Sequence, residues 1–241
     1  MVKYYKTKKG FTLVEIVAVI AVMGLIVAGV TAGKSLVKQA QLRSVINDIN
    51  KYKYAVNSFK MQYSAFPGDM ASASYYWSTS NGNGNGKLIH SSNDMTENLL
   101  FWQHLVLSGL IQGRYVSADQ GTPNSVPGIN VPKAYWNAGY YATNAYENHG
   151  IFGTTSANAI SLTIQGPYNW FYGVIRPREA HAIDAKIDDG LPARGMVYSD
   201  SSSTNCASQL RAFTGNLASV TYVMTTNIPS CRMWFWIDKP V

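Results

Sequence analysis

The segment from residue 11 to residue 32 constrains this chain more than any other. It contains 22 residues, and Glu15 is the only ionisable one among them. A helix rises about 1.5 Å per residue, so this segment spans roughly 33 Å as a helix, which is enough to cross the hydrocarbon core of a bilayer. A single carboxylate in such a helix is costly in lipid, so we expect Glu15 to have a partner.

The charges before this segment predict its orientation. Four lysines precede it: Lys3, Lys6, Lys8 and Lys9. Positive charge before a membrane span holds that end in the cytoplasm, so the chain beyond residue 32 is expected outside the cytoplasm. The whole chain has 20 basic and 13 acidic residues, a formal charge of +7, and without the four lysines the balance is 16 against 13, or +3. So small an excess does not call for a polyanion, and we expect no nucleic-acid partner.

The residues at the start of the apolar segment resemble a known processing site. The sequence Lys-Gly-Phe-Thr-Leu-Val-Glu at residues 9–15 is similar to the prepilin peptidase site of type IV pilins and type II secretion pseudopilins. This resemblance implies cleavage after Gly10 and N-methylation of Phe11. It also implies that Glu15 pairs with the N-terminal ammonium of a neighbouring subunit during assembly. The motif is specific because it needs the basic leader, the Gly-Phe junction, the spaced glutamate and the apolar run together.

The same resemblance implies partners and a location. The partners are prepilin peptidase, other pilin or pseudopilin subunits and the inner-membrane assembly platform. The location is the bacterial inner membrane, crossed once with the N-terminus in the cytoplasm and the head in the periplasm, and later a pilus or pseudopilus. We expect a structural subunit rather than an enzyme, since the four histidines show no metal-ligand spacing and no Gly-x-Ser-x-Gly sequence is present. The mature length of 231 residues (241 minus 10) favours a minor subunit.

Two other classes of function stay open. Val30-Thr31-Ala32 fits an ordinary signal peptidase, and cleavage there gives a mature chain that starts at Gly33. The protein is then an exported binding protein or adhesin that uses its N-terminus only for export. The acidic residue inside the apolar run and the helical pattern that continues past Gly33 disfavour this alternative. An envelope enzyme on a membrane anchor is the third class.

The apolar pattern predicts that the helix continues beyond the membrane. Apolar residues recur three or four positions apart, at Val37, Leu42, Val45, Ile46, Ile49, Tyr52, Val56, Phe59 and Tyr63. This spacing predicts one helix over residues 11–63 with a buried stripe, ended by Pro67-Gly68. Residues 64–93, rich in glycine and asparagine, predict a flexible exposed loop.

The later segments predict the rest of an α+β protein. Short helices are expected near residues 99–110 and 179–186, and strands over residues 135–143, 150–155, 159–165, 196–199, 220–227 and 232–238. The fold class is therefore a long N-terminal helix, membrane-spanning in its first half, packed on a small globular head with an antiparallel β-sheet, which is also the pilin-like architecture. The expected domains are a leader at 1–10, the N-terminal helix at 11–63 with its transmembrane or filament-core segment at 11–32, and the head at 64–241.

Two groups of side chains in the head carry chemistry. Cys206 and Cys231 lie in the part expected outside the cytoplasm, where thiols are oxidised, so we expect a disulfide; two separate buried thiols are the alternative. Asp184, Asp188 and Asp189 form an acidic cluster whose oxygen atoms suit Ca²⁺. Three carboxylates are few, however, and their spacing is not that of an EF-hand, so we expect a helix end capped by aspartate side chains and a turn, with calcium as the alternative, and no cofactor.

Overall fold

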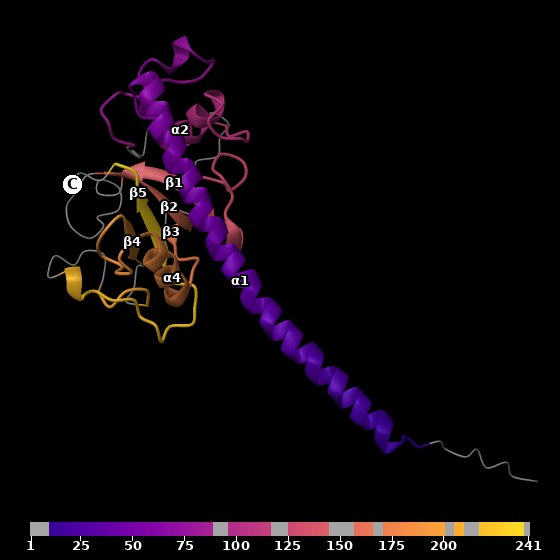
Figure 1. Cartoon of the computed structure of the whole chain (residues 1–241). Coiled ribbons are helices and arrows are strands. Elements are labelled where there is room, and N and C mark those ends of the chain that lie inside the picture. Colours follow the sequence, from indigo (N-terminus) through magenta and orange to yellow (C-terminus); the bar gives the residue numbers. More distant parts are fainter. Residues whose placement is uncertain are drawn as a thin grey trace, which may run out of the picture. The chain divides into compact units, whose positions relative to one another are not determined.

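The computed structural model describes residues 10–88, 96–116, 125–144, 157–165, 171–200, 205–209 and 217–238. The chain divides into two compact units, Met1–Gln41 and Leu42–Val241. The helix α1 covers Leu13–Tyr63 and contributes residues to both units (Figure 1). The prediction of one long N-terminal helix is confirmed.

In the first unit, α1 exposes its apolar side chains. Phe11 is 85% exposed and Leu13 is 81% exposed, and every residue from 14 to 32 is also exposed. Among the described residues, α1 is the one helix that is long and apolar enough to cross a membrane. Apolar surface of this extent is stable only in lipid or against other apolar surface, so the unit needs one of these surroundings.

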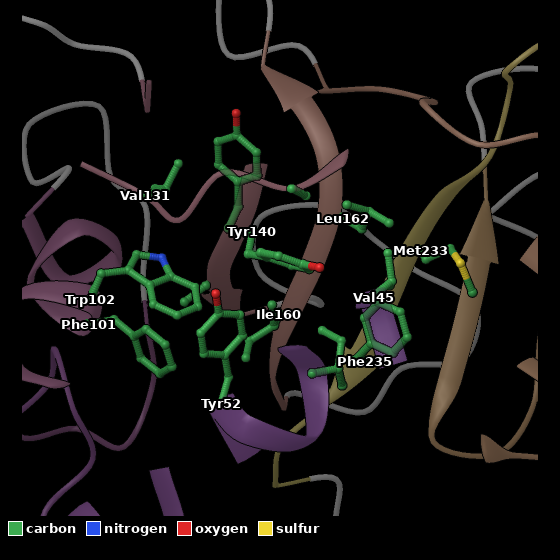
Figure 2. Packing of buried hydrophobic residues seen from close by; sticks show 14 of the residues in the cluster. Val45, Tyr52, Phe101, Trp102, Val131, Tyr140, Ile160, Leu162, Met233 and Phe235 are labelled. Carbon is green, nitrogen blue, oxygen red and sulfur yellow. The ribbon is translucent and has the colours of Figure 1, made fainter. Parts of the chain in front are cut away.

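In the second unit, the remainder of α1 buries one stripe of side chains. They are Leu42, Val45, Ile49, Tyr52, Ala55, Val56 and Phe59. This stripe packs in a single core with the sheet and with α2, Thr96–Leu107. Figure 2 shows Tyr52 close to Trp102 and Tyr140, and the ring centroids are 4.9 Å and 5.2 Å apart with edge-to-face geometry. Such aromatic pairs add to the free energy gained from burial alone.

The sheet of the head is antiparallel throughout. Its strands are β1 (Gly139–Asn144), β2 (Asn158–Gln165), β3 (Phe171–Tyr172), β4 (Val197–Asp200) and β5 (Arg232–Trp236). The order is β1-β2-β5-β4, and β3 pairs with β2 beside this path. The expected α+β head with an antiparallel sheet is therefore confirmed. The strand predicted over residues 150–155 lies outside the described residues.

Two local predictions of strands were wrong. Residues 220–227 form no strand; the contact there is an isolated bridge between Ala207 and Tyr222. The first residues of the strand predicted at 135–143 form a 3₁₀ turn, Tyr135–Asn137, because Trp136 and Asn137 have positive φ angles that a strand does not allow. The helix predicted at 179–186 is present as α4, Pro177–Ile187.

The loop that follows α1 is exposed only in part, since residues 66–70 are buried, and hydrogen bonds fix its backbone. The carboxylate of Asp69 is buried and accepts hydrogen bonds from the backbone nitrogens of Asn85 and Gly86 at 2.9 Å and 2.7 Å. The chain packs so closely here that a Cβ atom added at Gly82 would lie 2.4 Å from the backbone of Asp69. Composition predicted a flexible loop because it cannot show that a buried carboxylate holds the backbone.

A buried ion pair joins β4 to β5. Arg232 donates from Nε to Oδ1 of Asp200 at 3.0 Å, and Nη2 of Arg232 pairs with Oδ2. Trp234 donates from Nε1 to the same Oδ1 at 2.9 Å, and Nη1 of Arg232 donates to the carbonyl of Phe171 at 3.2 Å. Because the side chains of Arg232 and Asp200 are only 4% and 0% exposed, neither charge has water to replace its partner.

Candidate functional site

The first turn of α1 is closed by a capping box between Thr12 and Glu15. Oε2 of Glu15 accepts hydrogen bonds from the backbone nitrogen of Thr12 at 2.8 Å and from its Oγ1 at 2.9 Å. Oγ1 of Thr12 in turn accepts from the backbone nitrogen of Glu15 at 3.3 Å. A capping box satisfies donors that the start of a helix otherwise leaves unpaired, so Glu15 has a local role in starting α1.

The capping box leaves one oxygen of Glu15 available. Among the described residues, no donor is bonded to Oε1, whereas Oε2 accepts both hydrogen bonds from Thr12. The carboxylate is thus held in one orientation and still has room for a further donor. Our sequence analysis identified Glu15 but missed Thr12, although the spacing Thr-x-x-Glu before an apolar run is itself a capping-box signal.

The expected cleavage junction lies just before this capping box. Gly10 and Phe11 are exposed, and among the described residues no atom beyond those of the adjoining residues lies within 4 Å of the place where a Cβ of Gly10 would be. An exposed backbone outside the helix is what an enzyme that cuts after Gly10 needs. The leader residues 1–9, with their four lysines, lie outside the described residues.

Comparison with known proteins identifies this segment. Residues 5–31 match the family model of the prokaryotic N-terminal methylation motif. This motif is the signature of type IV pilins and pseudopilins. The match covers the N-terminal segment alone; there the motif is of the kind found in pilin-like exported proteins, and it points to a structural subunit processed by prepilin peptidase. No curated protein and no solved structure matches the chain.

Replacing Thr12 by alanine should loosen the first turn of α1. Loss of an N-cap hydroxyl costs about 1 kcal/mol, which is roughly a fivefold shift toward the open turn. Hydrogen exchange at the amide of Glu15, measured on the purified chain in detergent micelles, should accelerate by about this factor. Thr12→Ser keeps the hydroxyl and is the matched control, which should exchange like the wild type. Equal exchange in Thr12→Ala and wild type would show that the capping box does not stabilise the turn.

The head contains the expected disulfide. Cys206 and Cys231 are both buried and joined, with their Cα atoms 4.9 Å apart and a sequence separation of 25. Closing a loop of this length stabilises the fold by about 3–4 kcal/mol in the chain-entropy account. Since disulfides persist in oxidising compartments, this bond agrees with a head outside the cytoplasm.

The acidic cluster lies at the C-terminal end of α4, and each of its three carboxylates accepts at least one hydrogen bond from a protein donor. Carboxylate oxygens of Asp184, Asp188 and Asp189 lie within 4.8 Å of one another. Asp184 accepts from the hydroxyl of Tyr222 at 2.8 Å and from the nitrogen of Gly190 at 3.2 Å. Asp188 accepts from the nitrogens of residues 196 and 197, and Asp189 from that of residue 191. These bonds are those of the expected capped helix end and turn, and calcium remains the alternative.

The buried carboxyl of Asp184 makes the stability of the head depend on pH. Burial, the largest cause, raises the pKa of Asp184 to about 7, although the hydrogen bonds from Tyr222 and Gly190 lower it. Between about pH 4 and pH 7 the folded protein therefore binds more protons at this group than the unfolded chain does. The stability that the protonated carboxyl of Asp184 contributes is present at acidic pH and is lost as the pH rises through that window.

Asp184→Asn should remove this dependence. The unfolding free energy of the variant minus that of wild type should be about 2–4 kcal/mol larger at about pH 8 than at about pH 4. Urea unfolding of both proteins at the two pH values measures this. The difference between variant and wild type cancels the contributions of other titrating groups. One of these groups is His104, whose pKa is lowered to about 4 by burial. A difference that stays constant with pH would contradict the assignment.

Proposed function

We propose that this chain is a structural subunit of a type IV pilus or a type II secretion pseudopilus. One observation carries the proposal: a carboxylate, Glu15, is held in a capping box at the start of an otherwise apolar and exposed helix, directly after a Gly-Phe junction. A segment used only as a signal could use the capping hydrogen bonds of this side chain but would have no need of its charge. A subunit that docks by charge would need it in a defined orientation.

In this proposal the chain passes through two environments. Prepilin peptidase removes the leader at residues 1–10, and Phe11 is methylated. Residues 11–32 then span the inner membrane, and the helix at 11–63 carries the head, residues 64–241, in the periplasm. On assembly, apolar neighbouring helices replace lipid around residues 11–32. Because one apolar surrounding replaces another, the exchange costs little, and polar contacts decide the register.

Glu15 supplies that register contact. Its free Oε1 accepts the methylated ammonium of Phe11 from the next subunit. Two opposite charges about 4 Å apart gain on the order of 4 kcal/mol at an effective dielectric constant near 20. A subunit docked one turn out of register leaves the carboxylate unpaired among apolar side chains, which is costly, so a single axial offset is favoured.

The large head favours a minor subunit over the main repeating one. A second function, adhesion by an exported binding protein, draws on one observation, namely that Tyr75 is 89% exposed and Tyr76 is 59% exposed on the head. Exposed aromatic rings are typical of binding surfaces. The two functions are compatible if the minor subunit presents its head at the filament surface.

Sheared filaments test the proposed role. An epitope-tagged chain should appear in the sheared filament fraction, in smaller amounts than the main subunit, and should be missing from that fraction in cells without prepilin peptidase. If the tagged chain stays in the membrane, or is released as a monomer while filaments form normally, it is not a filament subunit.

A further inference from the structure

Residues 81–86 contain three consecutive Asn-Gly pairs. Asn-Gly is the dipeptide in which asparagine deamidates most readily. The backbone nitrogen of the glycine attacks the side-chain carbonyl carbon of the asparagine, a C–N bond forms, and ammonia leaves with the proton of the attacking nitrogen. Water then opens the succinimide to aspartate or isoaspartate. Glycine favours this attack because it has no Cβ to hinder the approach or to restrict the backbone.

In this fold, each of the three attacking nitrogens is engaged in a hydrogen bond. The nitrogen of Gly82 donates to the carbonyl of Met70 at 2.9 Å. The nitrogen of Gly84 donates to the carbonyl of Asp69 at 2.9 Å, and the nitrogen of Gly86 donates to Oδ2 of Asp69 at 2.7 Å. A nitrogen that attacks must lose its proton and turn toward the asparagine side chain, so each of these bonds opposes the reaction.

The side chains under attack are also held. Oδ1 of Asn81 accepts from the backbone nitrogen of Ser74 at 2.8 Å. Oδ1 of Asn83 accepts from the nitrogen of Asn85 at 2.9 Å, and Oδ1 of Asn85 accepts from the nitrogen of Lys87 at 2.8 Å. Both partners of the reaction are therefore held by hydrogen bonds at all three pairs.

Asp69 is the residue on which most of this arrangement depends. It is 4% exposed and uses both its carbonyl and its carboxylate to hold the loop. Glu97, on α2, holds the same loop by accepting from the nitrogen of Asn83 at 2.9 Å. Opening the loop would expose the Asp69 carboxylate and release the nitrogens of Gly84 and Gly86 together, because both donate to Asp69.

We propose that Asn81, Asn83 and Asn85 are deamidation sites that Asp69 keeps unreactive in the folded head. The tract reacts only in subunits whose loop has opened. Aspartate formed at position 85 puts a second carboxylate beside that of Asp69, and isoaspartate lengthens the backbone by one methylene group. Both products oppose reclosure of the loop, so the modification records opening irreversibly.

The wild-type protein provides the first test. The purified chain is incubated at mildly alkaline pH, folded in detergent and unfolded in urea, and peptide mapping by mass spectrometry follows each of the three asparagines. Each should deamidate at least about tenfold more slowly in the folded protein, which corresponds to about 1.4 kcal/mol for opening the loop. Equal rates in the two states would overturn the proposal.

Asp69→Ala tests the role of the carboxylate. In the folded variant, deamidation should accelerate most at Asn85, whose glycine loses its acceptor, and least at Asn81, whose glycine is bonded to Met70. Asp48→Ala is the control, since Asp48 is partly buried and, like Asp69, accepts a hydrogen bond, here from Tyr140 at 3.1 Å, without contact to the tract. Asp69→Asn, which keeps one acceptor oxygen, provides a milder variant should Asp69→Ala not fold.

The site-resolved rates decide the outcome. Acceleration that is strongest at Asn85 in Asp69→Ala or Asp69→Asn, with wild-type rates in Asp48→Ala, supports the proposal. Uniform acceleration in all variants would mean that general loss of stability, and not Asp69, controls the reaction. Unchanged rates in a folded Asp69 variant would overturn it as well.

Discussion

Glu15→Ala is expected to abolish incorporation of the chain into filaments while leaving cleavage after Gly10 intact. The variant loses the charge that would accept the ammonium of the neighbouring Phe11. A loss on the order of 4 kcal/mol corresponds to about a thousandfold weaker docking, which other subunits would outcompete. Cleavage should persist because the peptidase acts on the Gly10–Phe11 junction, which precedes the helix.

Two related variants separate charge from helix capping. Glu15→Gln retains an oxygen for the capping box but carries no charge, and Thr12→Ala retains the charge but loses the cap. Immunoblots of sheared filaments and of membranes measure incorporation and cleavage for each variant. We expect Glu15→Gln to fail like Glu15→Ala and Thr12→Ala to be incorporated at a reduced level. Normal incorporation of Glu15→Gln would show that charge does not set the register.

Asp200→Ala is expected to be among the most destabilising single changes in the head. It leaves the guanidinium of Arg232 buried without its carboxylate and removes the acceptor of the Trp234 indole. Breaking one side of a buried ion pair typically costs about 3–5 kcal/mol, because the remaining charge is neither hydrated nor paired. Urea unfolding of the purified chain at constant pH measures this loss.

Two controls define the cause of that loss. Adding Arg232→Met to Asp200→Ala removes both charges and should recover much of the lost stability, since a buried pair can often be replaced by apolar side chains. Arg194→Met breaks the exposed pair with Asp189, whose atoms lie 3.9 Å apart, and should cost less than about 1 kcal/mol. If Asp200→Ala lowers the unfolding free energy no more than Arg194→Met does, burial does not make the Asp200–Arg232 pair more stabilising than an exposed pair.

The elements that the sequence predicted well are those governed by local periodicity. The stripe that includes Val45, Ile49 and Val56 could be predicted because a helix returns to the same face every three or four residues, whatever it packs against. Glu15 could be identified because its chemistry conflicts with its apolar neighbours and the surrounding motif resembles that of pilins. Thr12 was equally accessible from its spacing to Glu15.

The features that sequence could not predict depend on partners far away in the chain. Asp200 and Arg232 meet across two strands at a sequence separation of 32, and no local pattern pairs them. Asp69 is fixed by glycine nitrogens more than ten residues later, so composition alone predicted a free loop. Residues 220–227 have the side chains of a strand, but a strand forms only where a neighbour offers its backbone, and here Tyr222 finds a single bridge.

The central claim is that residues 11–32 form a processed membrane helix that is later buried in a filament. Identifying the N-terminal residue of the mature protein tests this claim most directly. Mass spectrometry of the N-terminal peptide, from chain isolated from its native envelope, measures it. The account predicts a chain that begins with N-methylated Phe11. A mature chain that begins at Gly33, without the apolar helix, would contradict it.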